Sequence, residues 1–211
     1  MKEIKIVGVG RAGGNILNST VKEIASNIEY ILLTTDSLDK VKGFNDIVIK
    51  KIGEFVNGDD KKGARCAKEH EKVLKNVFQN TDVVVIIGGL GGGTASGAIP
   101  IVCQYIKELN IKMICILSRP FNVEGKIRNE FANLAIENIK KYCDNNIIID
   151  NQKLLEYLNG KDIFESFEFA NMTLAMIVEI TTKYIIKNDN LNLNDIKNML
   201  INRDVRFLHL F

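Results

Sequence analysis

Six glycines within the ten residues Gly88–Gly97 (GGLGGGTASG) constrain this chain more than any other feature of its sequence. The segment follows the apolar run Val83–Ile87 and opens a helical pattern predicted at Ser96–Leu109. Adjacent glycines leave the backbone bare, so several N–H groups can point at one anion, and the start of a helix adds its dipole. Glycine also loses more entropy on folding than any other residue, and nothing local demands so many of them. The pattern therefore predicts a strand, a phosphate-binding loop and a helix, in that order.

A further glycine-rich loop, Gly8–Asn15 (GVGRAGGN), lies near the start of the chain. It follows a strand predicted at Lys5–Val9 and leads into a helix predicted at Gly14–Ala25. Its GxGxxG spacing, with Asp36 placed 23 residues after Gly13, also matches the fingerprint of dinucleotide-binding proteins. An NAD-type oxidoreductase is therefore an alternative, as is a loop whose glycines serve only tight packing of strand against helix.

Short β-branched runs alternate with longer helical patterns, which is typical of a parallel sheet covered by helices. Further strands are predicted at Tyr30–Thr34, Ile47–Lys50, Met113–Leu117 and Asn146–Ile149, and further helices at Gly63–Gln79, Glu124–Cys143, Lys153–Leu158 (after an N-cap at Asn151) and Asp195–Ile201. We expect an α/β fold with a doubly wound, mostly parallel, Rossmann-like sheet in the strand order 3-2-1-4-5-6. A long helix at Ile163–Lys187 is apolar nearly all round, so we expect it to be packed on most sides. The last ten residues, Asn202–Phe211, show no usable pattern.

In this strand order the first and fourth strands are neighbours, so the two glycine loops would face each other across one crevice. A dinucleotide needs only the first loop for its pyrophosphate. Two facing phosphate-binding loops are better suited to a nucleoside di- or triphosphate. The sequence has no Walker-type Lys-Ser/Thr pair, so this is not the chemistry of a P-loop.

Composition narrows the class of protein further. A formal net charge of +2 is too small a bias to indicate nucleic-acid binding. We find no run of about 20 apolar residues for direct membrane insertion and no secretory signal, so we expect a cytoplasmic protein. The four cysteines are far apart and predict reduced, mostly buried thiols. His70 and His209 are isolated, so no protein metal site is predicted.

Several motifs together resemble the GTPase domain of the FtsZ/tubulin superfamily. GGLGGGTASGA is similar to the tubulin signature GGGTG[ST]G, with Ala95 in place of a glycine, and Gly8–Asn15 resembles the first FtsZ loop. Arg119–Arg128 (RPFNVEGKIR) resembles the sugar-binding segment, Ile149–Leu155 (IDNQKLL) resembles IPNDKLL, and Phe167–Asn171 resembles the guanine-facing start of the central helix. The matches occur in family order from Ile4 to about Leu200.

The resemblance implies a site for GTP or GDP with Mg²⁺. Residues 10–15 would hold the α- and β-phosphates and residues 91–96 the β- and γ-phosphates. Glu124 would accept hydrogen bonds from the ribose hydroxyls, with Arg128 near sugar or phosphate. The full set implied to bind nucleotide is Gly10, Arg11, Ala12, Gly13, Gly14, Asn15, Gly91, Gly92, Gly93, Thr94, Ala95, Ser96, Glu124, Arg128, Asn151, Phe167 and Asn171, of which Asn15, Asn151 and Asn171 would face the guanine and Phe167 would stack on it.

Hydrolysis in this family depends on a loop after the central helix, pattern NxDxxD, that enters the nucleotide pocket of the next subunit. The matching residues here are Asn190, Asn192 and Asp195. Asn192 replaces one of the two acids, and an amide does not act as a general base. The resemblance thus implies a GTPase that is weak and that needs a neighbouring subunit.

Other departures concern the ligand. Met172 stands where the family has an aspartate that accepts from guanine. The segment Glu54–Asp60 is acidic where the family has a γ-phosphate loop, and two carboxylates near a triphosphate would repel it unless Mg²⁺ lies between them.

We expect residues 1–187 to form the nucleotide-binding domain with its central helix, and 188–211 a loop and the start of the next helix, without the family's second domain. The leading expectation is a GTP-binding cell-division protein of the cytoskeleton that polymerises with itself or with a full-length FtsZ-like subunit. The alternative is a non-catalytic nucleotide-binding module that caps or modulates such a filament. The oxidoreductase is a remote third.

Overall fold

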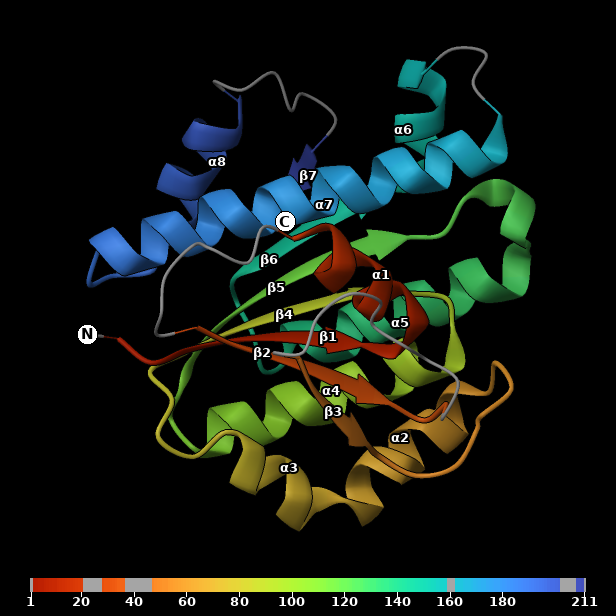
Figure 1. Cartoon of the computed structure of the whole chain (residues 1–211). Helices are drawn as coiled ribbons and strands as arrows, with labels where there is room; N and C mark the ends of the chain where they lie inside the picture. The colour runs from red at the N-terminus through yellow and green to blue at the C-terminus, as the bar shows by residue number, and fades with distance from the viewer. Residues whose placement is uncertain (1, 21–27, 37–46, 159–161, 202–207, 211) are drawn as a thin grey trace.

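The computed structural model describes residues 2–20, 28–36, 47–158, 162–201 and 208–210. Among them a sheet of seven strands runs in the order β3-β2-β1-β4-β5-β6-β7 (Figure 1). The strands are β1 (Ile4–Val9), β2 (Ile28–Thr34), β3 (Ile47–Lys51), β4 (Val83–Gly89), β5 (Lys112–Arg119), β6 (Asn146–Asp150) and β7 (Leu208–Leu210). The first six are parallel to one another, which confirms the predicted strand order.

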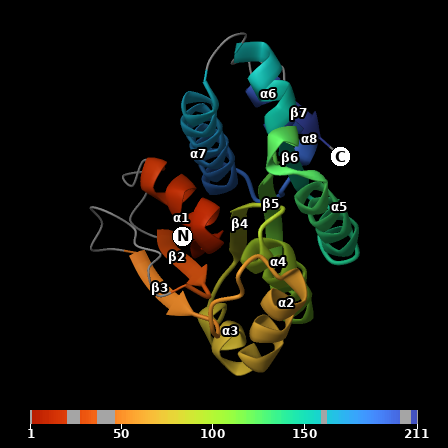
Figure 2. The same ribbon diagram turned by 90° about the vertical axis from the view of Figure 1, so that its right-hand side faces the viewer.

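Helices cover both faces of the sheet, as Figure 2 shows. On one face lie α2 (Asp60–Glu69), α3 (Glu71–Val77), α4 (Gly93–Glu108) and α5 (Lys126–Lys140), and on the other α1 (Gly10–Ser19), α7 (Ile163–Lys187) and α8 (Leu193–Ile201). Alternate residues of β1 enter the two cores, because successive side chains of a strand point to opposite faces: Val7 packs with the first group of helices and Ile6 with the second. The doubly wound α/β prediction is confirmed.

Helices α4 and α8 begin three and two residues earlier than predicted, and three other predicted helices differ more. The first begins at Gly10, not Gly14, and ends at Ser19, because the glycine loop itself forms its first turn. The helix predicted at Gly63–Gln79 is two helices, α2 and α3, divided at His70. The helix predicted at Glu124–Cys143 is a 3₁₀ turn, η1 (Asn122–Glu124), followed by α5, because Gly125 at φ 102° interrupts the helical backbone.

Two further differences from the predicted elements concern α6 and the end of the chain. Helix α6 (Asn151–Leu158) includes Asn151 as its first residue, whereas that residue was predicted to be the cap. Strand β7, which no sequence pattern predicted, pairs antiparallel with β6. It lies in the segment of the chain that showed no usable periodicity.

Helix α7 has the bounds that the sequence predicts. Contrary to our expectation that no such run exists, it is long and apolar enough to cross a membrane by length and composition, with a mean hydropathy of 1.2 over an 18-residue window. That window is 61% buried inside the fold, so packing against the sheet accounts for its apolar character. The packing is closest in its second half, since Phe164 and Met172 in the first half are exposed.

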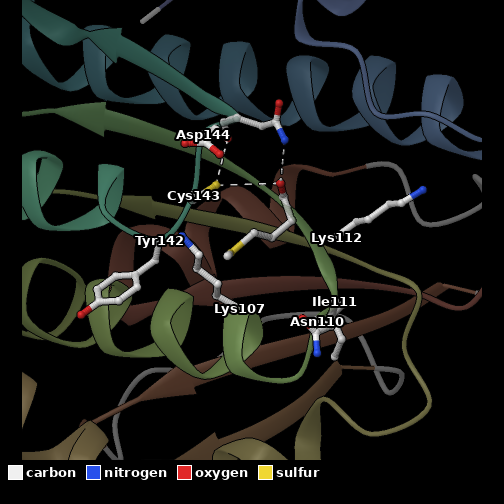
Figure 3. A pocket seen from close by; sticks show the side chains of 9 residues that line it. Lys107, Asn110, Ile111, Lys112, Tyr142, Cys143 and Asp144 are labelled. Atoms are coloured by element: carbon white, nitrogen blue, oxygen red, sulfur yellow. Dashed lines mark hydrogen bonds between the residues drawn. The ribbon is translucent and has the colours of Figure 1, made fainter.

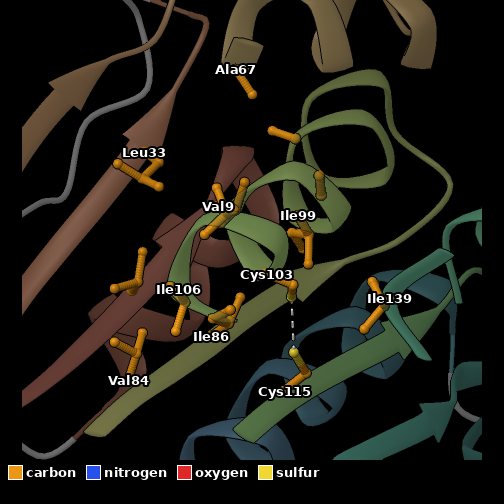
Figure 4. Close-up of a cluster of buried hydrophobic side chains, with 14 of the residues drawn as sticks. Val9, Leu33, Ala67, Val84, Ile86, Ile99, Cys103, Ile106, Cys115 and Ile139 are labelled. Carbon is orange, nitrogen blue, oxygen red and sulfur yellow. Dashed lines mark hydrogen bonds between the residues drawn. The ribbon is translucent and has the colours of Figure 1, made fainter. Parts of the chain in front are cut away.

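Three of the four cysteines form a buried group between α4, β5 and the end of α5. The Cys103 and Cys115 thiols lie 3.6 Å apart (Figure 4), and Cys143 donates to the carbonyl oxygen of Asn145 at 3.3 Å. The hydrogen bond with Cys115 and burial raise the pKa of Cys143. Cys66 is half-buried and, like the other three, reduced, so the prediction of reduced, mostly buried thiols is confirmed.

Candidate functional site

The two glycine loops meet where the neighbouring strands β1 and β4 end. A side-chain carbon on Gly10, which has φ 68°, would lie 3.3 Å from Cβ of Thr94 in the second loop. The hydroxyl of Thr94 is also 2.7 Å from that of Thr35, which directly follows β2. The ends of three adjacent strands therefore converge at one place, as the strand order predicted.

A cleft of about 640 Å³ opens at this place. Residues from both loops, from the segment after β5 and from the start of α7 line it. The sequence-predicted residues in its lining are Gly10, Arg11, Ala12, Asn15, Gly92, Gly93, Thr94, Ala95, Glu124, Arg128, Asn151, Phe167 and Asn171.

Four predicted residues lie beside the cleft and not in its lining: Gly13, Gly14, Gly91 and Ser96. Gly13 packs against Gly8, where a side-chain carbon would come within 2.7 Å of backbone, so it closes the strand against the helix. The Ser96 hydroxyl accepts a hydrogen bond of 2.8 Å from the Gly91 N–H. This bond fixes the shape of the second loop from within.

The glycines of the second loop are of two kinds. A side-chain carbon on Gly93 or Gly97 would overlap the backbone at the start of α2, where Gly63 makes the reciprocal contact. The same atom on Gly92 would meet nothing within 4 Å, although Gly92 lines the cleft. Gly93 and Gly97 therefore serve the contact between α2 and α4, and Gly92 leaves space at the cleft.

Both carboxylates that line the cleft are paired with arginines that also line it. Asp36 Oδ2 lies 3.1 Å from Arg11 Nη2, and Glu124 Oε2 lies 2.7 Å from Arg128 Nη1. Glu124 also accepts a 2.9 Å hydrogen bond from the Phe121 N–H through Oε1. The predicted common face of Glu124 and Arg128 is thus confirmed.

Amides and aromatic rings occupy the end of the cleft formed by α6 and α7. Phe167 packs edge-to-face on the buried Phe121, with ring centroids 4.7 Å apart. The Asn151 Oδ1 atom is buried and has no hydrogen-bond partner among the described residues. Asn171 lines the cleft, whereas its neighbour Met172 is 64% exposed and does not.

The acidic segment before α2 differs from our expectation. Phe55, Val56, Asn57 and Gly58 line the cleft, whereas Glu54, Asp59 and Asp60 do not. The Asp59 carboxylate instead caps α2, accepting from the Lys62 N–H at 3.0 Å. The carboxylates of this segment therefore lie outside the lining of the cleft.

Further lining residues lie outside the set that the sequence implied to bind nucleotide. They are Val9, Phe55, Val56, Asn57, Gly58, Gly89, Leu90, Ser118, Pro120, Phe164 and Ala170. Ser118 lies near the end of β5, Pro120 directly follows that strand, and Phe164 precedes Phe167 by one helical turn. Only Ser118 and Phe164 among them lie outside every segment that the sequence linked to a nucleotide site, and their positions near the end of β5 and at the start of α7 place them here.

A protein-held Mg²⁺ ion does not fit these side chains. Mg²⁺ takes oxygen ligands in a strict octahedron and is commonly bound by one or two carboxylates together with phosphate oxygens. In the described part of the chain no three His, Cys, Asp or Glu side chains converge on one point. The two carboxylates of the cleft are each bound to a guanidinium.

The residues implied in hydrolysis lie outside the lining of the cleft. The Asp195 carboxylate accepts a 2.9 Å hydrogen bond from the Tyr184 hydroxyl, and Asn192 Oδ1 accepts from the Asn194 N–H. At 1.5 Å per residue, Asn171 and the end of α7 at Lys187 are about 24 Å apart along the helix. Asn190, Asn192 and Asp195 follow that far end, so the structure does not bring them to the cleft of their own chain.

A smaller hollow of about 280 Å³ lies at the opposite end of the sheet, where β5 and β6 begin (Figure 3). Lys107 and Lys112 line it, and their ammonium groups donate to the backbone oxygens of Lys141 and Asp189 at 3.1 and 2.9 Å. No residue that the sequence predicted for a site lies in this hollow.

Comparisons with known proteins match this architecture. The model of the Tubulin/FtsZ family, GTPase domain, matches residues 3–159. Cell division protein FtsZ of Buchnera aphidicola subsp. Baizongia pistaciae is 34% identical over 199 residues, which are 90% of this chain and 51% of that protein. Cell division protein FtsZ 1 of Pyrococcus woesei is 33% identical over 97% of this chain and 58% of its own length. The chain thus spans about half the length of the curated relatives it matches.

Solved structures agree in fold. The empty FtsZ dimer of M. jannaschii superposes with a TM-score of 0.78 and 29% identity, covering 85% of this chain and 54% of the other. CetZ2 from Haloferax volcanii, solved as a GTPgS-bound protofilament, gives a TM-score of 0.73 at 19% identity over 85% of this chain and 57% of its own, a likeness of fold alone.

Proposed function

The chain belongs to the Tubulin/FtsZ family, GTPase domain, and from this membership we propose that its cleft binds GTP or GDP. The observation that carries the proposal is the convergence of two glycine-rich loops, each at the start of a helix, on one cleft at the ends of β1 and β4. Helix starts and bare backbone N–H groups favour phosphate. The family match also favours this nucleotide over the dinucleotide that GxGxxG and Asp36 left open.

In this proposal three groups of residues contact the phosphates, the sugar and the base of the nucleotide. The phosphates lie against residues 10–12 and 92–95, where Gly92 leaves space for close approach. The sugar lies beside Glu124, whose carboxylate is an acceptor for hydroxyl donors. The base lies between Phe167 and the amides of Asn151 and Asn171. The unpartnered Asn151 oxygen supports this assignment, because a buried acceptor without a donor is costly unless a ligand supplies one.

Hydrolysis, in this proposal, takes place between subunits. Asp195 belongs to the loop and helix beyond the far end of α7, so it acts on the nucleotide of a neighbour. The neighbour is a second copy of this chain or a full-length FtsZ-like subunit. The FtsZ of M. jannaschii, solved as a dimer, supports self-association. The relatives named cell division proteins support a role in division. We propose that this role is carried out in the cytoplasm.

A second candidate function is a nucleotide-binding module that does not hydrolyse and modulates a filament made by a longer relative. Asn192 carries no general-base carboxylate, and its side chain accepts from the Asn194 N–H as part of a local turn. Under this candidate GTP binds and stays intact at any protein concentration.

The experiment that tests the proposal identifies the ligand directly. The chain is purified without added nucleotide, denatured, and the released small molecules are identified by mass spectrometry. The protein is then titrated with GTP, GDP, ATP and NAD⁺ by calorimetry. Co-purified guanine nucleotide and the tightest binding to GTP or GDP are expected. Preferred binding of NAD⁺ would refute the assignment.

A further inference from the structure

We propose that Arg11, held in place by Asp36, supplies at the phosphate end of the cleft the positive charge that Mg²⁺ supplies in many triphosphate sites. Binding of a nucleoside polyphosphate to this chain is then independent of a divalent cation. The inference rests on the proposed function and concerns the same cleft.

Arg11 lies close to the junction of the two glycine loops. It belongs to the first glycine loop, one residue after Gly10, whose backbone lies against Thr94 of the second loop. Its partner Asp36 directly follows Thr35, and the Thr35 hydroxyl is 2.7 Å from that of Thr94. The ion pair therefore lies where the two phosphate-binding loops meet.

The ion pair joins a largely buried carboxylate to an exposed guanidinium. The Asp36 side chain is only 14% exposed, so the backbone and its neighbours fix it, whereas the Arg11 side chain is 73% exposed. The 3.1 Å contact to Asp36 holds the guanidinium in the lining of the cleft. A guanidinium has five N–H donors in a planar fork that matches the oxygens of a phosphate. A phosphate therefore reaches Arg11 from the open side of the cleft while Asp36 orients it.

The charged groups in the lining of the cleft are paired with one another. The charged side chains there are Arg11, Asp36, Glu124 and Arg128, in two ion pairs. A carboxylate bound to a guanidinium does not offer the same oxygens to a metal ion. Asp59, which the sequence placed near the phosphates, is engaged in capping α2. At the phosphate end the protein thus presents the Arg11 guanidinium as a fixed cation. It does not present free carboxylates that would ligate a metal ion.

Fluorescent GDP and a fluorescent non-hydrolysable GTP analogue, titrated with excess Mg²⁺ and with excess EDTA, test the inference. For the unaltered chain we expect the two dissociation constants of each ligand to agree within about threefold. In Arg11→Ala, affinity in EDTA should fall about tenfold or more, since charge-assisted hydrogen bonds to phosphate are lost. Mg²⁺ should partly restore it, because Asp36 is then released to ligate the ion. The double variant Arg11→Ala/Asp36→Asn should lose that rescue.

Arg65→Ala is the matched control, because Arg65 is an exposed arginine on α2 outside the lining of the cleft, and it should behave as the unaltered chain. Arg11→Lys, which keeps the charge without the fork, should fall between. Circular dichroism checks that each variant is folded. Strict Mg²⁺ dependence of the unaltered chain, or Mg²⁺-independent binding that persists in Arg11→Ala, overturns the inference and leaves the proposed function standing. Absence of nucleotide binding in both buffers overturns both.

Discussion

The Tyr184 hydroxyl donates a hydrogen bond of 2.9 Å to the Asp195 carboxylate. Burial and this bond to Asp195 raise the pKa of Tyr184, so the hydroxyl stays protonated and remains a donor. The acid that the family resemblance implies in hydrolysis is thereby tied to the last turns of α7. Asp195 therefore lies beyond the end of α7, away from the cleft that the start of α7 lines.

Asp195→Asn should therefore leave the dissociation constant for GTP unchanged and lower phosphate release, because its carboxylate lies outside the cleft. If hydrolysis occurs between subunits, activity per molecule of the unaltered chain should also rise with protein concentration. Phosphate release at saturating GTP, measured over a range of protein concentrations, checks both points. A linear dependence together with undiminished activity in Asp195→Asn would show that this loop takes no part.

Two glycines of the second loop should respond oppositely to substitution. Gly92→Val should weaken nucleotide binding by at least about tenfold without lowering the melting temperature, since its side chain enters the open cleft. Gly97→Ala should destabilise the fold by about 1–3 kcal/mol, because the added carbon overlaps the backbone of α2. Thermal melts and fluorescent-nucleotide titrations on both variants measure the contrast. Equal loss of stability in the two would contradict this assignment of space.

Asn151→Leu should separate binding from stability in another way. The Asn151 Oδ1 atom is buried without a partner, so replacing the amide by an apolar group of similar size should leave the melting temperature equal or higher. Guanine-nucleotide affinity should fall about tenfold, equivalent to about 1.4 kcal/mol, if this oxygen accepts from the base. Calorimetric titration with GDP and a thermal melt measure the two effects. An unchanged affinity would mean that the oxygen does not face the ligand.

Thiol labelling should distinguish one cysteine from the other three. Cys103, Cys115 and Cys143 are buried, and hydrogen bonding between the thiols together with burial raises the pKa values of Cys115 and Cys143. These groups stay as unreactive thiols well above neutral pH. N-ethylmaleimide should therefore modify the native chain rapidly at Cys66 alone and at four positions after denaturation, as counted by intact mass. In Cys66→Ser the rapid modification should vanish; if it persists, one of the buried thiols is reached in the native state.

The parts of the fold that the sequence predicted are those with a strong local pattern. The strands next to the glycine loops and the 25-residue helix α7 have long apolar runs, and the strand order follows from the arrangement of helices between them. The division at His70 carries no proline or glycine to mark it. Strand β7 owes its conformation to pairing with β6, a partner about 60 residues away in sequence, so a local pattern does not reveal it.

The same distinction applies to the candidate site. Loop backbones and the Glu124–Arg128 pair follow from motif and helical spacing, and the structure brings them together. The pairing of Arg11 with Asp36 joins residues 25 positions apart, through the ends of adjacent strands. In the acidic segment before α2, a helix cap and a ligand contact attract the same residue type, and Asp59 serves as the cap.

The contact between α2 and α4 also bears on how this sequence can change over generations. Gly63, Gly93 and Gly97 are held by the volume between two helices, and that demand continues whether or not a nucleotide is ever bound. A descendant that lost its ligand would still be selected to keep these three glycines. Gly92, where an added side-chain carbon would meet nothing within 4 Å, would then be free to drift. Among relatives of this chain, the residue at position 92 is therefore the better record of whether the ligand has been kept.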